Sequence, residues 1–150
     1  MRYLGSYAVV LALHLLTVAF VVGPLAVAAV SSPRLVRAGD LEGLRSAVRT
    51  TRIYAAATLV TVLLGTALVG LSGTGTTKWD MGDAWIVGSY VLWLAAVVLT
   101  VAVVLPGLRA AVAALESSGT AATGRIAVGA GLAMLCWVAI IVLMVSKPGA

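Results

Sequence analysis

The chain is dominated by long apolar runs that alternate with short polar segments. The runs cover residues 4–30, 53–71, 84–105 and 126–145, and each is about 20 residues or longer. A helix rises about 1.5 Å per residue, so about 20 residues cross the hydrocarbon core of a bilayer. The runs do not alternate between apolar and polar positions, which favours helices over barrel strands, since backbone amides in lipid must be satisfied within their own segment. We therefore expect an all-α fold, an integral membrane four-helix bundle, in a single transmembrane domain spanning residues 1–150.

The composition supports a membrane protein. The chain is 62% hydrophobic and 10% charged, against about 25% charged residues in soluble domains. The net charge of +5 comes largely from arginines that flank the apolar runs, so we expect no nucleic-acid partner. Cys136 is the only cysteine, which excludes an intramolecular disulfide and a cysteine-based zinc site. The preference for Arg over Lys, with abundant Ala, Val and Gly, indicates a bacterial gene.

The distribution of basic residues predicts the orientation. The segments between the first two runs and between the last two runs together carry seven arginines, whereas Arg2, Lys78 and Lys147 lie on the other side. Because basic loops stay in the cytoplasm, we expect both termini to be extracytoplasmic. The first run is longer than the apolar region of a signal peptide, so it is predicted to be a retained span. The predicted location is the bacterial plasma (inner) membrane, as a multi-pass protein.

The first cytoplasmic loop is expected to lead directly into the second helix. Asp40 can cap a helix that begins at Leu41. Arg45, Arg49 and Arg52 then follow one another along one side of this helix. We expect them to lie at the level of anionic lipid headgroups, where each arginine stabilises membrane binding by about 1 kcal/mol. The alternative is a docking surface for an anionic substrate or a partner.

Glycine and proline predict where the helices bend and pack. Gly23-Pro24 should bend the first helix, because Pro24 cannot donate a backbone hydrogen bond. Pro106-Gly107 is a candidate hinge in the third helix, which should continue past it into the cytoplasm. In the fourth run, small residues recur four positions apart, as Ala127/Gly131 and Gly129/Ala133. Such spacing allows close helix approach, either within the bundle or in a homodimer.

The outer loop, residues 72–83, is predicted to be a solvated connector. Its Gly and Thr residues are typical of a flexible segment, and its two carboxylates are too few ligands for a metal site. Asp83 is placed to cap the third helix. Trp79 and Trp85 are expected to form part of an interfacial aromatic belt.

His14 is the most informative single residue for function. It lies about ten residues from the outer end of the first run, hence roughly 15 Å deep and near the bilayer midplane. An ionisable side chain at this depth should avoid lipid and face the bundle interior. The same depth calculation places four residues of the other helices within about a turn of that level: Thr61, Trp93, Met134 and Cys136.

Several interpretations of His14 remain open. A neutral imidazole can hydrogen-bond a threonine or a backbone carbonyl across the bundle. Alternatively, His14 ligates haem b or copper, with sulfur from Met134 or Cys136 completing the site. A proton relay in a small transporter is less favoured, because such pathways usually contain intramembrane carboxylates and every Asp and Glu lies outside the apolar runs. No catalytic residue is predicted, since no second base is positioned to activate Cys136.

Leu13-His14 in the first run, followed by Gly23 and an arginine-bearing loop, resembles a family of uncharacterised bacterial four-span integral membrane proteins. That family is more distantly similar to copper-resistance protein D and to haem-associated membrane proteins with a histidine in the first span. The likeness covers the whole chain in layout. The resemblance implies a membrane four-helix fold and favours the hypothesis that His14 is a cofactor ligand.

The small size and the four apolar runs lead to a first hypothesis about function: a non-catalytic accessory or assembly component of a larger membrane complex, with no cofactor as the default. The alternatives are a haem- or copper-binding protein that uses His14, and a small transporter. The expected partners are the lipid bilayer and its anionic headgroups, together with a membrane-protein partner or a second copy of the chain.

Overall fold

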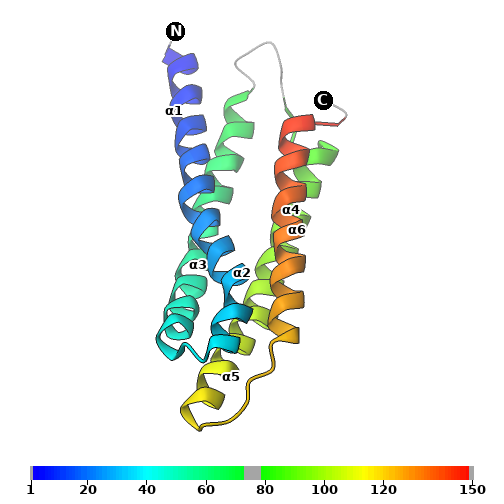
Figure 1. The fold of residues 1–150 in the computed structure, drawn as a ribbon. Helices are drawn as coiled ribbons and strands as arrows, with labels where there is room; N and C mark the ends of the chain where they lie inside the picture. Colours follow the sequence, from blue (N-terminus) through cyan, green and yellow to red (C-terminus); the bar gives the residue numbers. More distant parts are fainter. Residues whose placement is uncertain (1, 73–78, 149–150) are drawn as a thin grey trace.

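The computed structural model describes residues 2–72 and 79–148, and their side chains from residue 5 onward. Every regular element in this part of the chain is a helix, which confirms the predicted fold class (Figure 1). The helices are α1 (Arg2–Thr17), η1 (Val18–Val22), α2 (Gly23–Ala38), α3 (Leu41–Ser72), α4 (Ala84–Leu99), η2 (Thr100–Val104), α5 (Leu105–Glu116) and α6 (Gly124–Ser146).

Among the described residues, four helices are long and apolar enough to cross a membrane. The first is α1–η1–α2, the second α3, the third α4–η2–α5 and the fourth α6. The start of α1 and the end of α6 lie at the same end of the bundle (Figure 1). We call this end the outer end, following the orientation predicted from the arginines, and the opposite end the inner end.

The turn between α2 and α3 follows the prediction. Gly39 ends α2 in the left-handed conformation, with φ of 66°, and its amide bonds back to the carbonyls of Leu35 and Val36. Oδ1 of Asp40 then accepts a hydrogen bond from the backbone N–H of Gly43 at 2.8 Å. The predicted cap at Asp40 is therefore confirmed, and α3 begins at Leu41, well before its apolar run.

Two of the long helices contain a π-helical segment directly before a proline. The segment η1 ends two residues before Pro24, and η2 ends two residues before Pro106. In η2, the N–H of Leu105 bonds to the carbonyl of Thr100, five residues back. Because proline removes one backbone donor, a widened turn in front of it lets the helix continue in a new direction. These segments directly precede the two positions where the sequence predicts a bend, at Gly23-Pro24, and a hinge, at Pro106-Gly107.

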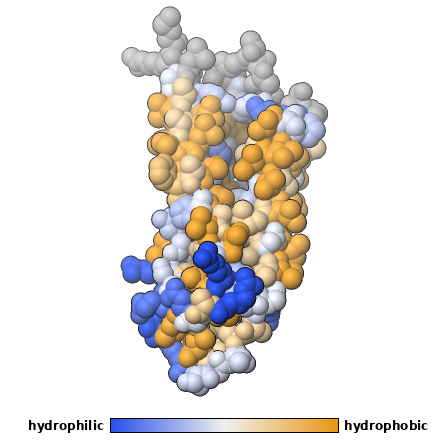
Figure 2. All heavy atoms as spheres, in the orientation of Figure 1, coloured by the Kyte–Doolittle hydropathy of each residue, from blue (hydrophilic) through white to orange (hydrophobic). Residues whose placement is uncertain are grey.

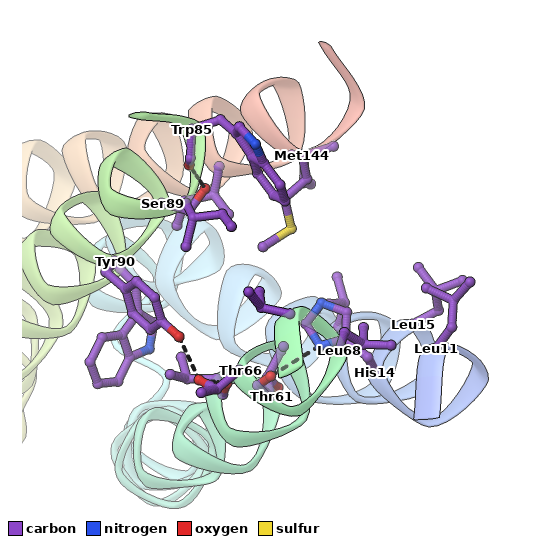
Figure 3. Close-up of a pocket in the computed structure, with 18 of the residues that line it drawn as sticks. Leu11, His14, Leu15, Thr61, Thr66, Leu68, Trp85, Ser89, Tyr90 and Met144 are labelled. Atoms are coloured by element: carbon purple, nitrogen blue, oxygen red, sulfur yellow. Dashed lines mark hydrogen bonds between the residues drawn. The ribbon is translucent and has the colours of Figure 1, made fainter. Parts of the chain in front are cut away.

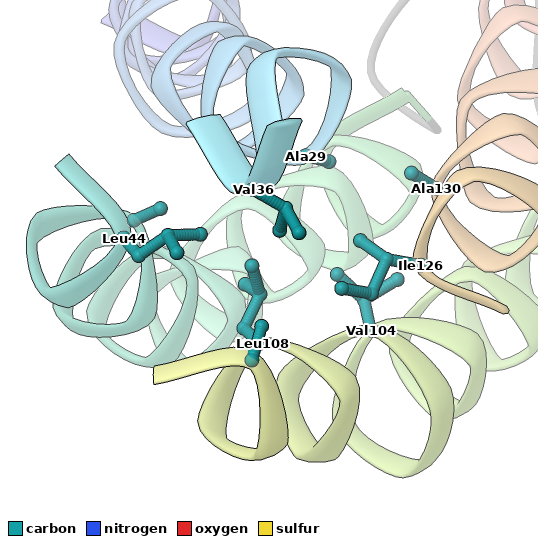
Figure 4. Close-up of a cluster of buried hydrophobic side chains, with 9 residues drawn as sticks. Ala29, Val36, Leu44, Val104, Leu108, Ile126 and Ala130 are labelled. Carbon is teal, nitrogen blue, oxygen red and sulfur yellow. The ribbon is translucent and has the colours of Figure 1, made fainter. Parts of the chain in front are cut away.

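Below the π segments, towards the inner end, the helices form a tightly packed apolar core (Figure 4). Its glycines allow the close approach, because a Cβ on Gly129 would lie 2.8 Å from Cγ1 of Val103. Ala133 is buried on the same side of α6, whereas Ala127 and Gly131 are exposed. The Gly129/Ala133 pair therefore serves the internal bundle. The buried core residues are Ala29, Val36, Leu44, Ala47, Val104, Leu108, Ala111, Ile126 and Ala130.

Above the π segments, towards the outer end, the helices pack as two pairs. α1 packs on α3, and α4 packs on α6 (Figure 1). At the inner end, by contrast, α2 contacts both α3 and α6, and α3 also contacts α5. The bundle is thus closed at its inner end and divided at its outer end, and this division creates the candidate site.

Candidate ligand cavity between the outer helix pairs

A cavity of about 460 Å³ lies between the two outer helix pairs. Such a volume is typical of sites for small organic ligands. Exposed side chains border it on both sides, among them Leu15 of α1 and Val145 of α6, which are 58% and 79% exposed. Figure 2 shows the upper part of this face hollowed between apolar surfaces. The cavity is thus bordered by exposed apolar side chains from both helix pairs.

The cavity wall is mostly apolar and rich in aromatic rings. Two tyrosines and four tryptophans line it, together with His14 and a few hydroxyl groups. The main aromatic and polar lining residues are Tyr7, His14, Thr61, Thr66, Trp79, Trp85, Ser89, Tyr90, Trp93, Trp137 and Lys147.

His14 is 6% exposed and lies on the cavity wall. Its Nδ1 lies 3.0 Å from the backbone carbonyl oxygen of Thr61 in α3. A carbonyl can only accept, so Nδ1 carries the proton and donates this bond. The other ring nitrogen, Nε2, is turned towards the cavity (Figure 3). The predicted burial of His14 in the bundle, and its bond to a backbone carbonyl across the bundle, are therefore both present.

The two helix pairs are joined behind the cavity by side-chain hydrogen bonds from α4 to α3. The hydroxyl of Thr66 donates to the carbonyl of Val62 at 2.9 Å. Because its one proton is used there, the hydroxyl of Tyr90 donates to Oγ1 of Thr66, at 2.5 Å (Figure 3). One level deeper, Nε1 of Trp93 donates to Oγ1 of Thr58 at 3.2 Å. These bonds fix the distance between α3 and α4 and thereby the width of the cavity.

The outer end of the cavity is covered by Trp79 and Trp85. Their rings meet edge to face, with centroids 5.6 Å apart, and Trp79 also contacts Tyr7 of α1. Trp85 is only 6% exposed, so the prediction of an interfacial aromatic belt is wrong for this residue. The rings turn inward because the divided helix pairs leave a space that apolar rings can fill.

Asp83 begins α4, but its side chain does not cap that helix. Instead, its Oδ2 accepts a hydrogen bond from the backbone N–H of Asp80 at 3.0 Å, within the turn before α4. The cap predicted at Asp83 is therefore wrong in its side-chain contact, because the local turn competes for the carboxylate.

The two sulfur ligands proposed from the sequence lie elsewhere in the bundle. Met134 and Cys136 pack against the buried cluster around Ala96 and Trp137, and neither lines the cavity with His14. The thioether on the cavity wall belongs to Met144, whose sulfur is directed into the space (Figure 3). Depth along a helix does not determine which face of α6 a side chain occupies, and these two side chains are not among the residues that line the cavity.

The predicted lipid-facing arginines are all exposed. Arg45 donates to Glu116 at the end of α5 at 2.7 Å and to Glu42 at 3.3 Å. It therefore links two helices at the inner end, a contact that the sequence did not indicate. Arg49 and Arg52 form no ion pair among the described residues and are free to meet anionic headgroups.

Comparison with protein-family models, with curated proteins and with solved structures finds no match for this chain. Its class rests on its own structure: it is a small polytopic membrane protein with four membrane-spanning helices. The similarity to copper-resistance protein D and related four-span proteins stays a prediction.

Proposed function

We propose that the protein binds haem b in the outer cavity, with Nε2 of His14 as an axial ligand. The observation that carries this proposal is the hydrogen bond from Nδ1 of His14 to the carbonyl of Thr61. Metal-bound histidines usually donate their second ring N–H to such an acceptor, which fixes the ring orientation and raises the basicity of the ligating nitrogen. His14 has this arrangement, and its remaining nitrogen faces a cavity.

The shape and lining of the cavity favour haem over copper. An aromatic and aliphatic space of about 460 Å³ suits a large planar apolar molecule. Copper sites need several nitrogen or sulfur donors around one point, and no cluster of three or more His, Cys, Asp or Glu side chains suited to a metal occurs in the described part of the chain. Haem iron already has four nitrogen ligands in its ring, so a single imidazole is a sufficient anchor.

The other two hypotheses receive less support from the site. No carboxylate is among the residues found to line the cavity, and a proton-coupled transporter usually has one. An accessory role in a larger complex stays a prediction, because side chains that face lipid and side chains that face a membrane partner are equally apolar.

Absorption spectroscopy of the purified protein tests the proposal. The wild-type protein, isolated in mild detergent and titrated with haemin, should give a Soret band at a stoichiometry near one haem per chain. His14→Ala should lose this band, because the only imidazole of the chain is removed. Metal analysis of the same samples should show iron and no matching copper.

Thr17→Val is the matched control. Thr17 lies one turn from His14, and its hydroxyl donates to the carbonyl of His14 within the same helix at 2.8 Å. This variant should bind haem as the wild type does. Folding of each variant is checked by circular dichroism. A folded wild-type protein that shows no Soret band, or a His14→Ala variant that keeps it, would overturn the proposal.

A further inference from the structure

A cation lies at the outer end of the cavity. Lys147 follows the last residue of α6 in a left-handed conformation, with φ of 40°, and its amide bonds to the carbonyl of Leu143 at 2.9 Å. Its ammonium group lies 4.1 Å from the ring centroid of Trp79 and 5.9 Å from that of Trp85. Lys147 lines the cavity and has no ion pair among the described residues.

The two tryptophans at this end of the cavity carry donors without acceptors. The indole Nε1 atoms of Trp79 and Trp85 are buried and have no hydrogen-bond partner among the described residues. Indole N–H can only donate, and a buried donor without an acceptor costs about as much as a lost hydrogen bond. The end of the cavity is therefore lined by one positive charge and by two indole rings whose buried N–H groups lack acceptors among the described residues.

This donor cluster and His14 border the same cavity at different depths. Tyr7, which contacts Trp79, precedes His14 by seven residues in α1, or roughly 10 Å along the helix. A ligand that reaches from His14 to the outer end must be apolar along most of its length. At the outer end it meets a cation and N–H donors.

We propose that the outer end binds the carboxylates of the ligand, through Lys147 and the indole N–H groups of Trp79 and Trp85. This inference rests on the proposed haem function and extends it, since haem b carries two carboxylate side chains on one edge of its ring. The carboxylates supply the acceptors that the indoles lack and a charge partner for Lys147. Placed next to aromatic rings rather than in bulk water, such a charged hydrogen bond is stronger than one at an open surface.

Comparing haemin with its dimethyl ester tests the haem function and the carboxylate site separately. The ester keeps the iron and the ring but has no carboxylate. The wild type should bind haemin about tenfold more tightly than the ester, as measured by Soret titration. Lys147→Ala should weaken haemin binding and leave ester binding unchanged, so that the preference disappears.

Trp85→Phe provides a second, independent variant, because it keeps an aromatic ring and removes one N–H donor. It should reduce the preference for haemin over the ester, while Thr17→Val should keep the full preference. If the wild type binds both compounds equally and Lys147→Ala changes neither, the carboxylate site is refuted while the haem function stands. If the wild type binds neither compound, the proposed haem function is refuted, and the carboxylate site that rests on it is refuted with it.

Discussion

The imidazole of His14 lies directly against Gly65 of α3. A Cβ atom on Gly65 would lie 3.2 Å from Cε1 of the ring, 3.6 Å from Nδ1 and 3.9 Å from Nε2. Glycine at this position lets α1 and α3 approach closely enough for Nδ1 to reach the carbonyl of Thr61. The absent side chain at position 65 is thus part of what positions the histidine.

Gly65→Ala should therefore weaken haem binding without removing the ligand. The new methyl group pushes the ring by a few tenths of an ångström and disturbs its hydrogen bond to Thr61. Changes to the partner that orients a metal-bound histidine usually cost 10- to 100-fold in affinity, and we expect about tenfold here. The measurement is a Soret titration beside the wild type.

Gly70→Ala is the control for this variant. Gly70 is in the same helix, and nothing lies within 4 Å of a Cβ built on it. Alanine should be neutral there, or stabilise the helix by up to about 1 kcal/mol, with haem affinity unchanged. Equal losses of affinity in both variants would contradict the role given to Gly65.

The helices and their turns follow from local properties of the sequence, which is why they could be predicted. The length of the apolar runs determines the spans, Asp40 caps α3, and Pro24 and Pro106 mark the places where a π-helical segment interrupts the α-helix. The cap and the proline positions depend on neighbours within about five residues, and the spans depend only on continuous stretches of the chain.

The cavity could not be predicted, because it depends on how the helix pairs separate. Trp85 looked like an interfacial residue, yet it is buried against Trp79. Met134 and Met144 are both in α6, and only the rotation of that helix decides that Met144 faces the cavity. A spacing of ten residues in α6 is not a whole number of turns, so small errors in the assumed rotation exchange inward and outward faces.

The hydrogen bond between Tyr90 and Thr66 should contribute to holding the two helix pairs together. We predict that Tyr90→Phe and Thr66→Val each destabilise the bundle modestly, and that the double variant shows a coupling of about 0.6 kcal/mol, the average for such bonds in membrane bundles. This coupling energy is measured by unfolding each variant in an SDS titration that is monitored by circular dichroism. Strictly additive effects would show that the bond contributes nothing.

The arginines of α3 should differ in their contribution to lipid binding. Arg49 has no ion pair among the described residues, whereas Arg45 is held by Glu116 at 2.7 Å. We expect Arg49→Gln to reduce the preference for anionic over zwitterionic lipid by about fivefold, as measured by native mass spectrometry, in line with about 1 kcal/mol per arginine. Arg45→Gln should reduce the preference less than Arg49→Gln does. A larger effect of Arg45→Gln would contradict the prediction that Arg49 binds the lipid headgroups.

If His14 holds haem, Met144 is the thioether on the cavity wall that would supply a second ligand to the iron. Its sulfur is directed into the cavity from α6 (Figure 3), and His14 lines the same cavity from α1. Histidine and methionine together are an established axial pair for haem iron. Met144→Leu nearly conserves volume, so the fold should tolerate it, but the absorption spectrum should change from that of six-coordinate low-spin iron to that of five-coordinate high-spin iron. Met134→Leu, on the same helix but not among the residues that line the cavity, should leave the spectrum unchanged. A spectral change in Met134→Leu alone would return the second ligand to the position first inferred from depth.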